Sequence, residues 1–270
     1  MNIDITLNRD DLTARTSEPW KPPVFSPPKT RLARLAALAR RSLDLQAASV
    51  WYDLSTLLAH AEGTVLDVGC GAQPYRGLFP PSVHYTAIDT ADAWAHFGYR
   101  MPDTLIIEGD VWPVDDASVD LVLSTETLEH VPDPSQFLSE ARRVLRPGGH
   151  LILTVPFAAR WHYIPHDYWR FTPSGLVTLL SPRGFEKIAV YARGNALTVA
   201  CYKVMALILP LLMRRAASPV VTVFHRLLGL ALSPVLLLLA ALARCSLRSR
   251  GGNDCLGYTV VAKAAGKLTP

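Results

Sequence analysis

Between residues 63 and 156, short apolar runs alternate with segments of helical or loop character, and this alternation constrains the fold more than any other feature. We predict strands at Thr64–Val68, His84–Asp89, Thr104–Glu108, Val119–Ser124 and His150–Val155. Runs such as TVLDV and HLILTV are almost continuously apolar, which is typical of parallel strands buried on both faces. The connections are long enough for crossovers, so the pattern predicts βαβ units in a doubly wound sheet.

Further signals extend this pattern. Asp133 is a predicted N-cap for a helix over Pro134–Leu145, which has proline in its first turn and a stop signal, RPGG, at its end. Apolar runs at Phe185–Tyr191 and Gly257–Lys263 are two more strand candidates. A helical run through Trp51 is predicted upstream of the first strand.

The first predicted strand leads directly into a glycine-rich turn. Gly69 and Gly71 allow the backbone to approach a ligand without interference from a Cβ atom. Asp89 ends the next strand, where nucleotide-binding folds place a carboxylate that accepts hydrogen bonds from the ribose hydroxyls. A dinucleotide fingerprint would need another glycine near Pro74, so the turn disfavours a nicotinamide-dependent oxidoreductase.

The run Asp67-Val-Gly-Cys-Gly resembles the first motif of class I S-adenosylmethionine (SAM)-dependent methyltransferases of the type 11 kind, and later segments follow in the order of this family. The resemblance implies a Rossmann-like α/β fold with a doubly wound seven-stranded sheet, its last strand antiparallel, and SAM as the cofactor. It also implies that Asp89 binds the ribose and that Asp110 reads the adenine amino group. The cofactor-binding residues that it implies are Asp67, Gly69, Cys70, Gly71, Asp89, Asp110, Val111 and Ser124.

The chain departs from this family just after the second glycine. Gln73 and Pro74 stand where many relatives have a further glycine. Proline suits the first turn of the short helix predicted over PYRGLF, so the site is expected to be intact, with a changed hold on the methionine part of SAM.

A group of potential metal ligands follows the fourth predicted strand. Glu126, Glu129 and His130 are similar to the E-x-x-E-H segment of ubiquinone-pathway O-methyltransferases, and this resemblance implies a divalent cation. Two carboxylates and one imidazole suit Mg²⁺ or manganese. The alternative is that the three side chains brace the loop through hydrogen bonds without a metal.

The segment Trp161–Thr172 follows the fifth predicted strand, where an open α/β sheet places its ligands. It combines aromatic residues with His166 and Asp167, which we predict to act as an oriented general base; His130 is a further catalytic candidate. The segment also looks like one found in methyltransferases of cell-surface glycan and lipid pathways. The alternative is a packing loop in which Arg170 pairs with Asp167.

The stretch from 194 to 255 separates the last two predicted strands and is strongly hydrophobic. Leu227–Ala243 has no charged residue and approaches the length needed to span a bilayer. Arg214 and Arg215 would place positive charge at the tip of a two-span hairpin, against the positive-inside rule. A monotopic or re-entrant helical hairpin is therefore favoured over a two-span anchor and over a soluble cap for an apolar acceptor.

The remaining features delimit the domains. Residues 1–30 form a predicted, poorly ordered Pro-rich arm; residues 31–193 with 256–265 form the methyltransferase domain; and residues 194–255 form the insertion. A leucine-arginine repeat from Arg31 predicts a helix at the start of the domain. The N-terminus has no basic region followed by an apolar run, so no secretory signal is expected. Four scattered cysteines without a CxxC pair fit a reducing compartment.

The net charge of +4 is too mild to indicate a nucleic-acid partner, and none is expected. We expect a cytoplasmic enzyme at the inner face of the membrane that methylates a hydroxyl of a lipid-linked, isoprenoid or glycan-type acceptor. Two alternatives are a soluble small-molecule methyltransferase and a non-catalytic SAM-binding scaffold or membrane adaptor. The oligomeric state and the atom that is methylated do not follow from the sequence.

Overall fold

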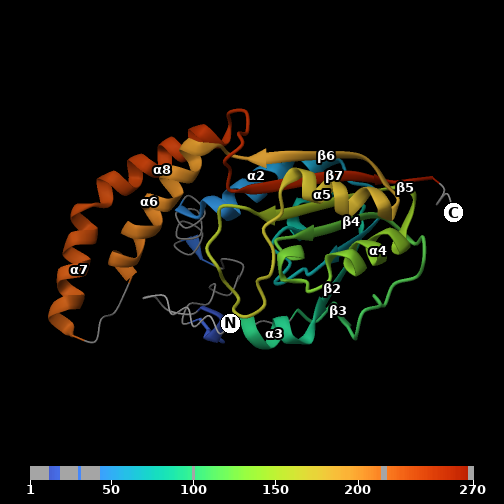
Figure 1. Ribbon diagram of the computed structural model, residues 1–270, viewed down its shortest axis with the longest axis horizontal. Helices are drawn as coiled ribbons and strands as arrows, with labels where there is room; N and C mark the ends of the chain where they lie inside the picture. Colours follow the sequence, from blue (N-terminus) through green and yellow to red (C-terminus); the bar gives the residue numbers. More distant parts are fainter. Residues whose placement is uncertain (1–11, 19–29, 32–42, 99–100, 214–217, 267–270) are drawn as a thin grey trace, which may run out of the picture.

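The computed structural model describes the chain except for residues 1–11, 19–29, 32–42, 99–100, 214–217 and 267–270 (Figure 1). Most of the predicted Pro-rich arm, the leucine-arginine repeat after Arg31 and the pair Arg214 and Arg215 therefore lie outside the described residues.

The described chain forms one sheet of seven strands in the order β3-β2-β1-β4-β5-β7-β6. β1 to β5 pair in parallel, whereas β7 is antiparallel to both of its neighbours. This confirms the predicted doubly wound sheet, because the chain order reverses between β1 and β4 and opens a crevice at their carboxyl ends. The strands are β1 Thr64–Val68, β2 His84–Thr90, β3 Thr104–Ile107, β4 Val119–Thr125, β5 Leu145–Pro156, β6 Phe185–Arg193 and β7 Gly257–Ala264.

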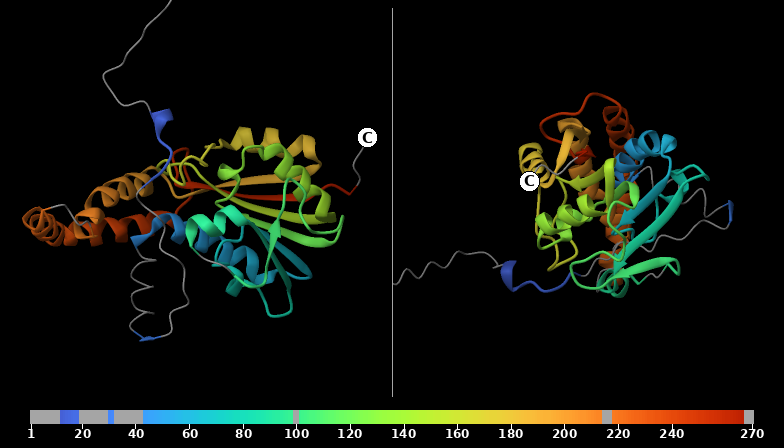
Figure 2. Two further views of the ribbon diagram at one scale, coloured as in Figure 1. Left: turned by 90° about the horizontal axis from the view of Figure 1, so that it is seen from below. Right: turned by 90° about the vertical axis from the view of Figure 1, so that its right-hand side faces the viewer.

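Helices cover both faces of the sheet (Figures 1 and 2). On one face, Leu66 and Val122 of the strands pack in a core with residues of α4 and α5. On the other face, Val65 and Leu123 pack with residues of α2. Neighbouring strand residues thus enter opposite cores, which explains why the strands are apolar along their whole length. The helices around the sheet are α2 Leu45–Leu57, α3 Ala91–Phe97, α4 Pro134–Val144 and α5 Pro173–Leu180.

Local signals explain several element boundaries. The Asp133 side chain accepts hydrogen bonds from the backbone N–H groups of Ser135 and Gln136, which confirms the predicted N-cap of α4. Beyond α4 the prediction was wrong in one respect. β5 begins at Leu145, so the RPGG stretch is part of this strand and not a loop before it. The helix predicted over PYRGLF is only a single 3-10 turn, η3 Arg76–Leu78.

Among the described residues, three helices occupy the connection between β6 and β7, and we call residues 196–213 and 218–247 the helical arm. They are α6 Ala196–Met213, α7 Pro219–Ala231 and α8 Ser233–Leu247. The arm projects from one end of the sheet domain, with α7 farthest from the sheet (Figures 1 and 2). Its root packs against Leu45 at the start of α2 and against Leu256 before β7.

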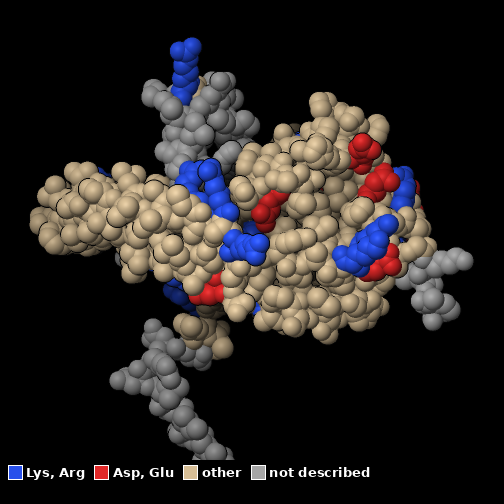
Figure 3. Space-filling model, turned by 90° about the horizontal axis from the view of Figure 1, so that it is seen from above, with Lys and Arg blue, Asp and Glu red and all other residues tan. Residues whose placement is uncertain are grey.

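α6 is long and apolar enough to cross a membrane, and α7 with α8 passes the same test as a pair bent by 51°. Pro219 and Pro234 lie in the first turns of α7 and α8, whereas Pro210 lies inside α6. In the view of Figure 3, most of the arm surface is free of charged side chains, and Lys and Arg side chains gather where it joins the sheet domain.

Candidate active site

A cavity of about 710 Å³ lies at the carboxyl ends of the parallel strands. One wall comes from the turn after β1, the end of β2 and the segment after β3. The other wall comes from the segment after β4 and the loop after β5. This is the position where an open α/β sheet binds its ligands.

The glycine turn after β1 has the backbone shape that the sequence predicts. Gly69 and Gly71 have φ values of +68° and +55°, a region that other residues adopt only at a cost. A Cβ atom at Gly69 would lie 2.3 Å from the side chain of Thr127, whose hydroxyl donates to the Gly69 carbonyl oxygen at 3.3 Å. The turn is therefore held against the segment after β4.

Gln73 explains how the chain accommodates its missing glycine. Its φ of +52° gives it the conformation that a glycine would adopt most easily. Its buried side-chain amide donates to Asp103 at 3.1 Å and to the Thr104 hydroxyl at 3.0 Å, and these bonds hold the turn. Pro74 follows and lines the cavity.

Asp89 lies at the end of β2 and is almost completely buried, but it reaches the cavity wall. Its carboxylate accepts hydrogen bonds from the backbone N–H groups of Gly71, at 2.9 Å, and Thr90, at 2.8 Å. The acid and the glycine turn are thus joined by a hydrogen bond.

Five of the eight residues predicted to bind the cofactor line the cavity: Gly69, Cys70, Gly71, Asp89 and Asp110. The structure places the other three, Asp67, Val111 and Ser124, outside its wall. Asp67 lies beneath the turn, where it accepts a hydrogen bond from the Tyr85 hydroxyl at 2.6 Å and burial raises its pKa to about 7. Val111 is exposed and Ser124 is buried. Trp112, the residue after Val111, lines the cavity.

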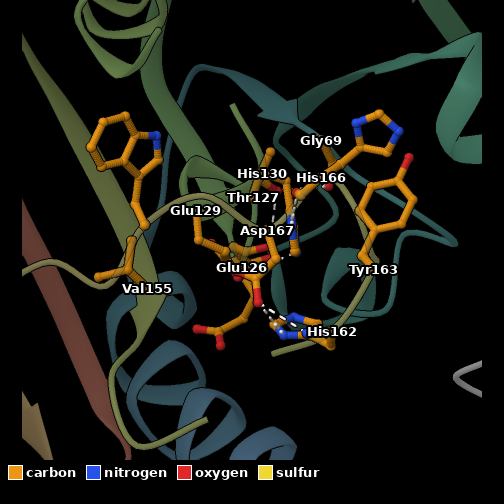
Figure 4. A network of polar contacts seen from close by, with 12 residues as sticks. Gly69, Glu126, Thr127, Glu129, His130, Val155, His162, Tyr163, His166 and Asp167 are labelled. Carbon is orange, nitrogen blue, oxygen red and sulfur yellow. Dashed lines mark hydrogen bonds and ion pairs between the residues drawn. The ribbon is translucent and has the colours of Figure 1, made fainter. Parts of the chain in front are cut away.

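In the loop after β5, His166 and Asp167 do not contact each other as the predicted catalytic pair would. Arg170 contacts both oxygens of the Asp167 carboxylate, at 2.6 and 2.8 Å. The backbone N–H and ring Nδ1 of His162 contact the same carboxylate, at 3.0 and 3.1 Å (Figure 4). Burial opposes these bonds, but they hold the pKa of Asp167 below its usual range. The predicted pairing of His166 with Asp167 was wrong, because Arg170 and His162 are the hydrogen-bond partners of the Asp167 carboxylate.

His166 itself lines the cavity together with Tyr163 and Tyr168. Its ring Nδ1 lies 3.2 Å from the Tyr168 hydroxyl. The loop is held in place from two sides. The backbone N–H of Tyr168 donates to the Glu129 carbonyl oxygen at 2.8 Å, and the backbone N–H of Tyr163 donates to the carboxylate of Glu18 at 2.7 Å. A polar, partly aromatic wall therefore faces the glycine turn across the cavity.

The predicted metal ligands Glu126, Glu129 and His130 do not converge. The Glu126 carboxylate pairs with the guanidinium of buried Arg193, at 2.6 Å. In the described part of the chain, the residues whose ligand atoms group together are Glu129, His130 and His162. Burial lowers the pKa of His130 to about 4, so its ring is neutral, and Nδ1 lies 2.7 Å from the His166 carbonyl oxygen (Figure 4).

Sequence reasoning missed several residues of the cavity wall. Thr90 ends β2 and is the N-cap of α3, Asp92 lies in the first turn of α3, and Gln136 and Phe137 lie in the first turns of α4. A general signal was available, since each helix follows a parallel strand and its N-terminus must lie near the carboxyl edge of the sheet. Tyr75, whose ring centroid lies 5.9 Å from that of Trp51 in α2, carried no such signal.

Residues 66–153 match the family described as "Methyltransferase domain". A probable S-adenosylmethionine-dependent methyltransferase of Mycolicibacterium smegmatis is 38% identical over 105 residues, which cover 37% of this chain and 41% of the relative. A ubiquinone biosynthesis O-methyltransferase of Caulobacter vibrioides is 29% identical over 147 residues, which cover 49% and 52%. The chain thus spans less than two thirds of the length of these relatives.

The fold has solved counterparts. The crystal structure of a SAM dependent methyltransferase from Archaeoglobus fulgidus aligns with a TM-score of 0.50 and 15% identity, over 84% of this chain and 99% of the other. At this identity the comparison is evidence for the fold, whereas the match of residues 66–153 includes the glycine turn and Asp89.

Proposed function

We propose that this chain, whose sheet domain belongs to the class I SAM-dependent methyltransferase superfamily, transfers the methyl group of SAM to a hydroxyl of a lipid-linked, isoprenoid or glycan-type acceptor at a membrane surface. The observation that carries the proposal is one cavity that has two different walls. The glycine turn and Asp89 form the wall for SAM, and His166, Tyr163 and Tyr168 form the opposite wall for the acceptor.

The residues of the first wall fit SAM. Asp89 would accept hydrogen bonds from the ribose hydroxyls, Asp110 would lie by the adenine, and the backbone at Gly69 and Gly71, which lines the cavity, would lie beside the methionine part. When bound, SAM supplies a methyl group that its sulfonium already makes electrophilic. The protein therefore has to hold the acceptor in line and take up its proton, and good orientation can contribute about 7–11 kcal/mol to lowering the barrier.

His166 is the proposed base for that proton. It lies on the cavity wall, and its Nδ1 has the Tyr168 hydroxyl as a partner, which positions the ring without help from Asp167. The role proposed for Asp167 is correspondingly indirect: together with Arg170 it shapes the loop that carries His166.

The proposed membrane contact depends on the helical arm. Five apolar side chains of α7 are more than half exposed: Val220, Val223, Phe224, Leu227 and Leu230. Among the described residues of this helix, the only buried one is Gly229. An apolar surface of this kind on a projecting element is unusual for a protein in water alone. We infer that the arm lies in the interfacial region of the inner leaflet and brings the cavity to a membrane-bound acceptor. The relative in ubiquinone biosynthesis is an O-methyltransferase, which agrees with a hydroxyl acceptor.

Asp89→Ala should weaken SAM binding at least tenfold, about 1.4 kcal/mol, because the ribose hydroxyls lose their acceptor and the glycine turn loses its anchor. Isothermal titration calorimetry with SAM measures this change. Asp92→Ala, at an exposed position of the same cavity wall, is the matched control and should change affinity less. Equal affinity of Asp89→Ala and the unmodified protein would remove Asp89 from the site.

The double variant Phe224→Asp/Leu227→Asp should lose binding to phosphatidylcholine–phosphatidylglycerol vesicles by about a hundredfold or more. Each apolar side chain contributes roughly 1.5–3 kcal/mol when it leaves water, and a carboxylate reverses that gain. Vesicle flotation measures the bound fraction. Val177→Asp replaces an exposed apolar residue on α5 and should leave binding unchanged. Persistent flotation of the double variant would contradict the membrane role of α7.

Methyl-labelled SAM tests the reaction itself. The protein is incubated with labelled SAM and either membranes or soluble extract, and the fraction that takes up the label is identified. Label in a lipid fraction supports the proposal. Label only in soluble compounds favours a small-molecule methyltransferase, and SAM binding without any transfer favours a scaffold that binds SAM without turnover.

A further inference from the structure

Glu129 has an environment that a lone carboxylate does not tolerate. Its side chain is completely buried, and neither carboxylate oxygen has a hydrogen-bond partner among the described residues. Removing an ionised carboxylate from water without compensation costs several kcal/mol. Its backbone is fixed, because the N–H groups of Tyr168 and Trp169 both donate to its carbonyl oxygen. The buried carboxylate is therefore held in a place where a cation would compensate it.

Two imidazole rings lie beside this carboxylate. Nε2 of His130 is 3.6 Å from a Glu129 oxygen, which is too far for a hydrogen bond. The rings of His130 and His162 are 4.9 Å apart, edge to face. One ligand atom from each of Glu129, His130 and His162 can be chosen so that the three atoms all lie within 4.8 Å of one another. A modest closure around one ion would bring them to bonding distance.

The outer contacts of the two rings have the pattern of metal-binding histidines. Nδ1 of His130 faces the His166 carbonyl oxygen at 2.7 Å, and Nδ1 of His162 faces the Asp167 carboxylate at 3.1 Å. A metal-binding histidine usually directs one ring N–H to a carbonyl or carboxylate, which leaves the lone pair of the other nitrogen for the metal. Arg170 holds Asp167 for this task through both of its oxygens.

We propose that Glu129, His130 and His162 bind one divalent transition-metal ion of the Zn²⁺ class. Two imidazoles and one carboxylate suit Zn²⁺ and its neighbours, whereas Mg²⁺ prefers oxygen ligands and water. This set differs from the oxygen-rich set predicted from the sequence, because Arg193 holds Glu126 and because His162 arrives from a loop more than thirty residues away.

The position of the ion would allow it to bind the acceptor, and this part of the inference rests on the proposed function. His130 lines the cavity, whereas Glu129 and His162 are not part of its wall. Three protein ligands leave coordination positions open. These positions would face the acceptor side, next to His166, where an acceptor oxygen is the ligand of suitable chemistry.

Metal binding can be tested without SAM or acceptor. The full chain is treated with a chelator, dialysed and titrated with Zn²⁺ in a calorimeter, and Co²⁺ serves as a spectroscopic probe through its d–d absorption. We expect one ion per chain and an intense Co²⁺ band typical of low coordination number. His162→Ala and Glu129→Gln should each weaken binding by at least about a hundredfold and abolish the band. Circular dichroism confirms that the variants are folded.

Two matched variants sharpen the result. Glu126→Gln should keep Zn²⁺ affinity within a few-fold, and so should His84→Ala, which removes an exposed histidine on β2. Absence of heat with millimolar Zn²⁺, unchanged affinity of folded His162→Ala, or loss of binding in Glu126→Gln would each overturn the site. A SAM titration of the same protein is read separately, so failure of the proposed function leaves the metal result intact and the reverse also holds.

Discussion

Arg193→Ala is expected to lower the free energy of unfolding by about 3–5 kcal/mol, because it removes a fully buried guanidinium and leaves its partners without their donor. The Arg193 side chain has no exposed surface, and its guanidinium donates to Glu126 at 2.6 Å, Ser49 at 3.0 Å and the Val155 carbonyl oxygen at 2.9 Å. These partners come from the segment after β4, from α2 and from β5. One side chain thus joins three elements at the root of the helical arm.

Urea denaturation followed by circular dichroism measures this loss. Arg146→Ala is the matched control, because Arg146 also pairs with a carboxylate, Asp120, but both side chains are substantially exposed. An exposed pair contributes only about 0–1 kcal/mol. If Arg193→Ala were no more destabilised than Arg146→Ala, the Arg193–Glu126 pair would have no special part in holding the arm to the sheet.

His166→Ala is expected to reduce the rate of methyl transfer by about 10²–10⁴-fold, the usual contribution of a positioned general base. SAM affinity should stay within twofold, because the side chain of His166 lies on the acceptor wall and not in the glycine turn. The backbone carbonyl of His166, which faces Nδ1 of His130, is retained in this variant.

Single-turnover assays with labelled SAM and the acceptor fraction separate this effect from binding. Tyr168→Phe removes the hydroxyl near the His166 ring and should cause a smaller loss. Added imidazole should restore part of the activity of His166→Ala, since a free base can enter the space left by the ring. An unchanged rate in His166→Ala would exclude it as the base.

The amino-acid sequence by itself determined the sheet and the cofactor wall. β1 to β5 were predictable because strands buried on both faces must be apolar along their length. The glycine turn was predictable because positive φ at Gly69 and Gly71 restricts the residue type at those two positions. The spacing to Asp89 follows from the length of the connection between β1 and β2, so these features depend on local constraints that a sequence displays directly.

Only the tertiary structure decided which side chains act together. Asp167 faces Arg170 and His162 and not its neighbour His166, and Glu126 pairs with Arg193 from β6. Asp67, which the motif suggested for the cofactor, lies under the turn with Tyr85. The reason is physical: a side chain takes its partner from whatever packs against it, and that packing joins segments far apart along the chain. Residue type limits the possible partners, but the fold selects among them.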